Sequence, residues 1–208
     1  MKSLLLVALL FGSASLDAAE PTNAAAVRKV FSEYRTALLD GNGAAAADLV
    51  TSGTIAYYDE ARQLAMSLPR AKLAELDFLS KLMVLRLRHE FTNAQLAALT
   101  GRELLAIGVK NGWISKSSVA NSELAEVKVD GAKATASLTV APQIPLFHFQ
   151  KESGKWKLDL LALFGMGNAA MRQQVEKSGL SEEQFILRLL GMLSSRKVDA
   201  GILSGPTR

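Results

Sequence analysis

One histidine can be paired with a carboxylate from the sequence alone. Two predicted strands flank a turn at 152–155, and the register that sets Phe149 against Leu158 also sets His148 opposite Asp159 on the other face. A carboxylate beside an imidazole can orient the ring and raise its pKa, as in a general base. We favour an ordinary cross-strand polar pair, because the face that carries Phe149 is the more apolar and should contact the helices.

Tyr57, Tyr58 and Asp59 form a second candidate cluster near the start of a predicted helix. A tyrosine next to an aspartate can polarise a carbonyl group, and the two tyrosines could line the wall of a ligand pocket. Neighbouring aromatic residues at a helix start more often belong to the core and its rim, so the sequence favours packing over catalysis here.

Arg86 and Arg88 could together clamp an anion. We favour a solvated helix face for them, with ion pairs to Glu90 and Asp77. No motif for a metal site, a nucleophile or a phosphate loop is recognisable, so we predict neither a metal nor a cofactor. No catalytic residue is assigned; the candidates for catalysis are His148, Asp159, Tyr58 and Asp59, and those for ligand binding are Tyr57, Tyr58 and Arg86.

Helices must position most of these residues, because apolar residues recur at helical spacing before residue 112 and after residue 167. The stretch 73–87 is apolar nearly all the way round and should lie at the centre of the helical layer. Capping boxes predict further helix starts at 92, 100 and 181. The last ten residues, 199–208, are expected to be frayed.

Residues 123–164 predict two successive β-hairpins, because apolar and polar residues alternate along them. Asp130-Gly131 is a type I′ turn signal, which would pair Val129 with Ala132 and Val127 with Ala134. The predicted fold class is therefore α+β, with helices packed on one face of a curved antiparallel sheet, extra helices in the middle of the chain and a C-terminal helical extension.

The order of helices and strands, ending in Phe147-His-Phe-Gln-Lys-Glu-Ser-Gly-Lys-Trp-Lys-Leu-Asp159, resembles the nuclear-transport-factor-2-like superfamily with its cystatin-like α+β roll. The resemblance covers residues 24–164 and implies a sheet wrapped on helices into a cone with an apolar pocket. Isomerases, dehydratases, ligand binders and interaction domains all use that fold, so it implies no single chemistry. The chain departs from compact members through extra helices at 69–112 and a helical tail, and no catalytic residue carries over.

The first residues have the layout of a secretory signal peptide: Lys2, an apolar run over 4–11, and small residues up to Glu20. The apolar run is too short to span a membrane. We therefore predict an exported protein of the periplasm or the extracellular space, with 1–19 as leader, 20–165 as the α+β domain and 166–208 as a helical extension packed on it. The formal net charge is only +4 and its cations are scattered, so we predict no nucleic-acid partner.

Three functional hypotheses follow. The sequence favours a binding module for a small apolar or amphipathic molecule, of which a periplasmic lipid carrier is a special case. An enzyme of the ketosteroid-isomerase or dehydratase type, using His148 with Asp159 or Tyr58 with Asp59, is the first alternative. The second alternative is a non-catalytic interaction protein, which could be a homodimer joined through the sheet face that carries His148.

Overall fold

A computed structural model describes residues 19–114, 116 and 119–205, so residues 1–18 of the predicted leader lie outside it. The described chain is an α+β fold. Along the sequence, helices precede and follow the strands of a four-stranded antiparallel sheet. Its helices are α1 (Ala19–Asp40), α2 (Gly43–Leu49), α3 (Ser52–Ser67), α4 (Arg70–Leu73), α5 (Phe78–Glu90), α6 (Asn93–Ala98), α7 (Gly101–Lys110), α8 (Phe164–Ser178) and α9 (Glu182–Leu193). Short 3₁₀ helices, η3 (Leu160–Leu163) and η4 (Ala200–Leu203), precede α8 and follow α9.

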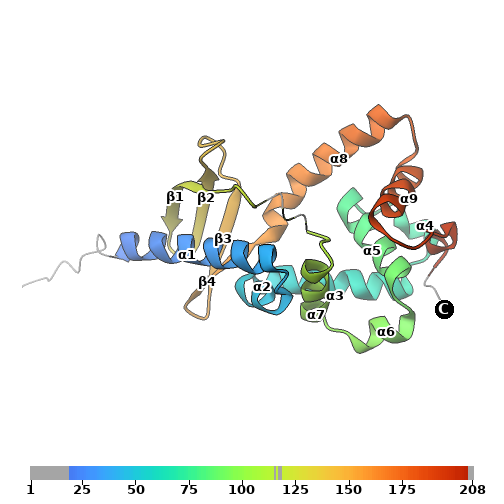
Figure 1. The fold of residues 1–208 in the computed structure, drawn as a ribbon, viewed down its shortest axis with the longest axis horizontal. Coiled ribbons are helices and arrows are strands. Elements are labelled where there is room, and N and C mark those ends of the chain that lie inside the picture. The colour runs from blue at the N-terminus through green and yellow to red at the C-terminus, as the bar shows by residue number, and fades with distance from the viewer. Residues whose placement is uncertain (1–18, 115, 117–118, 206–208) are drawn as a thin grey trace, which may run out of the picture.

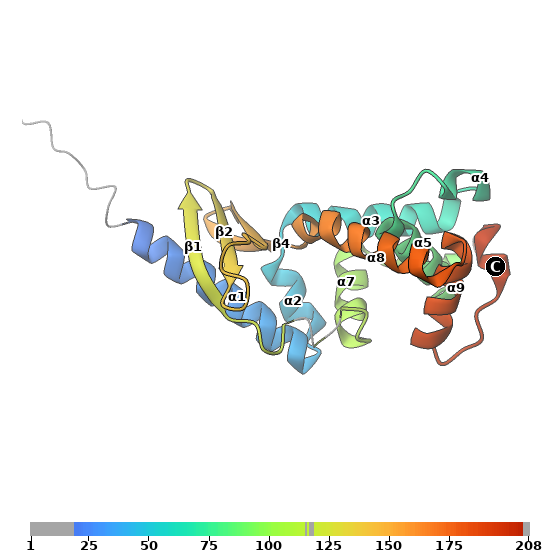
Figure 2. The same ribbon diagram turned by 90° about the horizontal axis from the view of Figure 1, so that it is seen from above.

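The molecule is elongated, with the sheet and α1 at one end and α9 and η4 at the other (Figures 1 and 2). The strands are β1 (Leu124–Asp130), β2 (Lys133–Leu138), β3 (Phe147–Glu152) and β4 (Lys155–Asp159), and they neighbour one another in chain order. Helix α1 crosses one face of this sheet, and α8 leads from the sheet to the far end of the molecule (Figure 1).

The second hairpin has the predicted register. Phe149 pairs with Leu158 and His148 with Asp159. The turn residues Ser153 and Gly154 both have positive φ, 48° and 79°, which is the requirement of a type I′ turn. The face that carries Phe149 is the buried one, as predicted, and its ring is 1% exposed.

The first hairpin was predicted in the wrong register. Val129 pairs with Ala134 and not with Ala132, so the two-residue turn is Gly131-Ala132. Gly131 has a φ of +56° and Ala132 does not have a positive φ, which is the pattern of a type II′ turn with glycine first. A type I′ turn at Asp130-Gly131 would have needed a positive φ at Asp130 as well.

Other segments of the chain contact both edge strands of the sheet. The Arg28 guanidinium of α1 donates to the carbonyls of Leu124 and Ala125, where the β1–β2 register is irregular. At the other edge the Thr51 amide donates to the Leu158 carbonyl over 3.0 Å. These bonds satisfy some of the backbone carbonyls that an edge strand would otherwise present to another chain.

Helix α5 lies at the centre of the helical part, as its apolar sequence predicted, and packs against α3, α8, α9 and η4. Its arginines were predicted to be solvated, and this was wrong for both. Arg86 is 8% exposed and Arg88 is 1% exposed. The Arg88 guanidinium donates to the carbonyls of Ala65 over 2.9 Å and Ile202 over 3.1 Å, so it joins the C-terminal end of α3 to η4.

The prediction that 199–208 are frayed was wrong for η4, and residues 206–208 lie outside the described residues. Residues 200–203 form η4, and Ile202 and Leu203 are 1% and 5% exposed. The bond from Arg88 to the Ile202 carbonyl explains this order, because a buried charged donor and two buried apolar side chains oppose fraying. Helix α8 begins at Phe164, four residues before its predicted start at Asn168.

Candidate functional site

His148 and Asp159 are cross-strand neighbours, but no hydrogen bond joins their side chains among the described residues. The Asp159 carboxylate accepts from the amide of Leu161 over 3.1 Å, which starts η3, and from the side-chain amide of Gln150 over 3.2 Å. His148 is exposed. The carboxylate therefore caps a helical turn and does not orient the imidazole.

Asp59 holds two helices together. Its Oδ1 accepts from the Gly101 amide over 2.9 Å and from Arg62 Nε over 3.3 Å. The α7 start comes so close to α3 that a Cβ on Gly101 would lie 2.5 Å from the Ile55 carbonyl oxygen. Asp59 is thus bonded to a neighbouring helix, and its carboxylate does not act together with Tyr58 in any hydrogen bond of the described chain.

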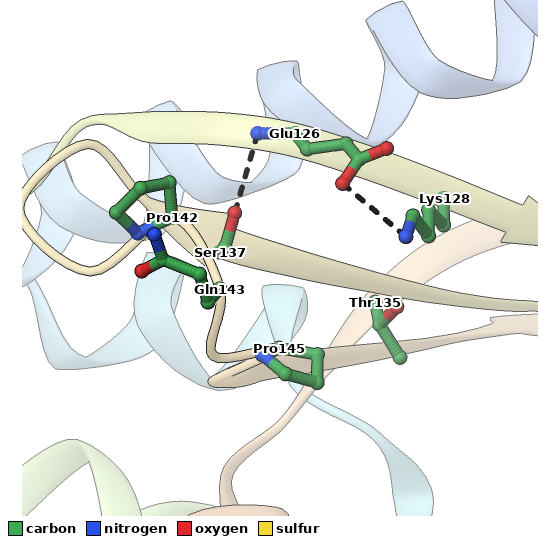
Figure 3. Close-up of a pocket in the computed structure, with 7 residues that line it drawn as sticks. All are labelled: Glu126, Lys128, Thr135, Ser137, Pro142, Gln143 and Pro145. Carbon is green, nitrogen blue, oxygen red and sulfur yellow. Dashed lines mark hydrogen bonds and ion pairs between the residues drawn. The ribbon is translucent and has the colours of Figure 1, made fainter.

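A polar hollow lies on the sheet face opposite α1 (Figure 3). It has a volume of about 210 Å³ and is lined by Glu126, Lys128, Thr135, Ser137, Pro142, Gln143 and Pro145. The Lys128 ammonium and the Glu126 carboxylate face each other at 3.3 Å, so the two charges in the hollow compensate each other. His148 is not among its lining residues.

Two overlapping hollows follow α1 and α2 on the molecular surface, with volumes of about 450 and 460 Å³. Both include Glu33, Asp48 and Leu49. The Asp48 carboxylate pairs with Arg102 at 2.7 Å, and Glu33 pairs with Lys29 at 3.7 Å. The two carboxylates that both hollows share therefore already have partners within the chain.

The interior differs, because buried polar groups there lack partners. We call Tyr34, Tyr57, Tyr58 and Arg86 the Tyr–Arg cluster; they come from α1, α3 and α5. The ring of Tyr58 is 6% exposed, and its hydroxyl interacts electrostatically with the other three members. The Tyr57 ring contacts the rings of Tyr58 and Phe164 edge-on, with centroids 5.5 Å and 4.9 Å away.

Three atoms of the Tyr–Arg cluster are buried without a hydrogen-bond partner in the described chain: Tyr34 Oη, Tyr57 Oη and Arg86 Nε. Two other such atoms belong to Arg35 and Asn93. Ser80 lies near the Tyr57 hydroxyl but not in hydrogen-bond geometry, so Tyr34 is the clearer case. A buried hydroxyl without a partner costs about 1–3 kcal/mol, which makes a group of them unusual.

Arg86 has one contact of note, with Trp113, whose ring centroid lies 4.8 Å from Cζ. Such cation–π contacts contribute about 0.5–2 kcal/mol, whereas burying an ion costs several kcal/mol. Trp113 follows α7 and is itself held against Gly108 and the ring of Phe91. The contact positions the guanidinium but does not balance its desolvation.

Burial decides the protonation of this cluster. Desolvation raises the pKa of Tyr57 to about 12 and raises the pKa values of Tyr34 and Tyr58 further. Desolvation also lowers the pKa of Arg86, and the charge of Glu90 opposes that change. The phenols are therefore hydrogen-bond donors at physiological pH. The carboxylate that acts on Arg86, Glu90, forms its ion pair with Arg196 instead.

The sequence singled out Tyr57, Tyr58 and Arg86 but missed Tyr34 and Trp113. Tyr34 lies in the apolar stripe of α1 and is buried, as expected of a core residue. Their types and spacing carry no signal of a missing partner, since that depends on which helices meet.

Within the described ranges, no group of three or more His, Cys, Asp and Glu side chains could hold a metal ion. None of the described helices is long and apolar enough to cross a bilayer. Comparison with family models, curated proteins and solved structures found no match for this chain. The site has therefore to be interpreted from its own geometry.

Proposed function

We propose that this chain is a binding module that holds a small amphipathic molecule at the Tyr–Arg cluster, where Tyr58 lies near Tyr34 and Arg86. The observation that carries the proposal is the Tyr–Arg cluster, whose donors at Tyr34, Tyr57 and Arg86 have no acceptor in the described chain. A molecule with oxygen acceptors at one end would satisfy these donors. Its apolar part would lie among aromatic side chains such as Phe164.

The physical support is the contrast with the rest of the molecule. At the surface hollows Asp48 and Glu126 form ion pairs. The candidate carboxylates Asp59 and Asp159 accept hydrogen bonds that hold helices and turns. Three of the five buried side-chain atoms without a partner in the described chain belong to this cluster. Local rules that fail in an otherwise consistent fold tend to mark a functional site.

The shape of the sheet, the location of the protein and the type of ligand belong to the same proposal. We propose a sheet curved into a cone as in the nuclear-transport-factor-2-like superfamily, export to the periplasm or the extracellular space, and a ligand that is apolar or amphipathic. The packing of α1 on the antiparallel sheet and the apolar face that carries Phe147 support the cone. A lipid carrier is the special case in which the ligand is exchanged with a membrane.

The test is to express the chain with its own leader, purify the exported form under mild conditions and record native mass spectra before and after lipid extraction. We expect a mass excess that extraction removes and that Tyr34→Phe lowers. Thr54→Val is the matched control, because the Thr54 hydroxyl is equally buried but bonded to Thr51. An empty protein that also binds no added amphiphile would refute the proposal, and the same spectra would report whether the protein is a dimer.

A further inference from the structure

Helix α5 buries three cations, and two of them have clear partners. The Lys81 ammonium forms an ion pair with the Glu182 carboxylate. The Arg88 guanidinium donates to backbone carbonyls of α3 and η4. Arg86 is buried to a similar degree, with 8% of its surface exposed, yet it makes neither a hydrogen bond nor an ion pair among the described residues.

One carboxylate, Glu90, attracts Arg86 through its charge, but it forms neither a hydrogen bond nor an ion pair with Arg86 among the described residues. Glu90, one turn further along α5, is engaged by the Arg196 guanidinium at 3.3 Å. The Tyr58 hydroxyl is close enough to interact electrostatically with Arg86, but it stays protonated. The contact with Trp113 uses the charge of the guanidinium and leaves its N–H donors available.

We infer that the ligand of the Tyr–Arg cluster carries an anionic headgroup, a phosphate or a carboxylate, and that Arg86 binds this headgroup beside Trp113. The inference rests on the proposed function and narrows its ligand to an anionic amphiphile. A planar guanidinium binds both oxyanions through two parallel N–H bonds, and it does so most strongly where water is excluded. The Tyr34 and Tyr57 hydroxyls would add donors to the remaining oxygens.

The experiment compares four probes that share one alkyl chain: dodecyl phosphate, dodecanoate, dodecanol and dodecyltrimethylammonium, each below its micelle concentration, with inorganic phosphate as a fifth. Binding is measured by calorimetry and by the fluorescence of Trp113 in a Trp156→Phe background. The variants are Arg86→Met and, as control, Arg172→Met, which removes the same charge from an exposed position on α8.

We expect the two anionic amphiphiles to bind at least about tenfold more tightly than dodecanol, and Arg86→Met to remove that advantage. Arg172→Met should leave it unchanged. In ligand-free protein Arg86→Met should raise Tm by about 2–4 °C, because the desolvation of the buried charge outweighs its attraction to Glu90. Binding of dodecyl phosphate alone, or of dodecanoate alone, would identify which oxyanion the site takes. Binding of inorganic phosphate as tight as that of dodecyl phosphate would show that the ligand needs no alkyl chain, and would overturn the amphiphile.

Each adverse result has a distinct meaning. Equal binding of all four amphiphiles, or unchanged binding in Arg86→Met, would overturn the anionic headgroup while the binding function stood. Failure of every probe to bind, together with an empty exported protein, would overturn both. An Arg86→Met protein that unfolds would show that Arg86 has an internal structural role, and would overturn the inference on its own.

Discussion

The sharpest test of the unpartnered interior is Tyr34→Phe, which removes one oxygen and keeps the ring. Tyr34 is 2% exposed and its hydroxyl has no partner in the described chain. Because the apolar burial stays the same, the change in the free energy of unfolding should reflect the hydroxyl alone. An unpaired buried hydroxyl costs about 1–3 kcal/mol, so the variant should be more stable by about that amount when no ligand is bound.

The assay is urea and thermal unfolding of protein stripped of bound molecules by lipid extraction. For a chain of this size, 1 kcal/mol corresponds to about 2–4 °C in Tm, which is well within reach of calorimetry. Thr54→Val is the control of opposite sign. The Thr54 hydroxyl is 0% exposed, lies 3.0 Å from the Thr51 hydroxyl and accepts from the Leu160 amide over 3.3 Å, so its removal should destabilise the protein.

The two readouts should move in opposite directions for Tyr34→Phe. Stability of the empty protein should rise and retention of the co-purifying molecule should fall, as is common where a site needs groups that the fold alone leaves unsatisfied. A Tyr34→Phe protein that is less stable than the wild type by 1 kcal/mol or more (about the worth of one hydrogen bond) would mean that the hydroxyl has a partner in the folded chain. That result would refute the reasoning behind the Tyr–Arg cluster.

Three further predictions concern the framework of the site. Arg88→Met should lower the free energy of unfolding by about 3–5 kcal/mol and expose the chain end to proteolysis, whereas Arg196→Met, at an exposed ion pair, should change it by less than about 1 kcal/mol. Gly101→Ala should destabilise the protein by about 1–3 kcal/mol in urea unfolding, because the new Cβ would lie 2.5 Å from a backbone oxygen of α3. Burial lowers the pKa of His89 below its ordinary value, so the unfolded chain takes up this proton at a higher pH than the folded chain does. The free energy of unfolding, measured by urea titration, should therefore fall as the pH drops below about 6.5. The variant His89→Gln should weaken this pH dependence. Stability that rises on acidification over that interval would contradict it.

Local signals in the sequence predicted the elements well. The capping boxes at Thr92, Thr100 and Ser181 all form, because a cap and its partner lie within four residues of each other. The second hairpin has the predicted register, because its two-residue turn needs positive φ at both central positions and Ser153-Gly154 supplies them. Each of these features is decided by neighbours in the chain.

The first hairpin shows what the alternation of apolar and polar residues cannot predict, which is the register of the two strands. A shift of two residues keeps every side chain on its predicted face, so the alternation of Val127 and Val129 with polar residues fits either register. The turn decides between them, through the single positive φ at Gly131. Sequence patterning could therefore predict the buried face but not which residues stand opposite.

By itself the sequence determined the α+β class, most helix boundaries, the buried face of the sheet and three members of the Tyr–Arg cluster as candidates. Only the tertiary structure decided which of two arginines on one helix, Arg86 and Arg88, has hydrogen-bond acceptors. Arg88 meets the free carbonyls at the end of α3 and those of η4, whereas Arg86 meets the face of Trp113 and no acceptor. The reason is physical: a side chain's type sets what it can bond, but its partners come from segments distant in the sequence, and the cost of a missing partner appears only once packing has excluded water.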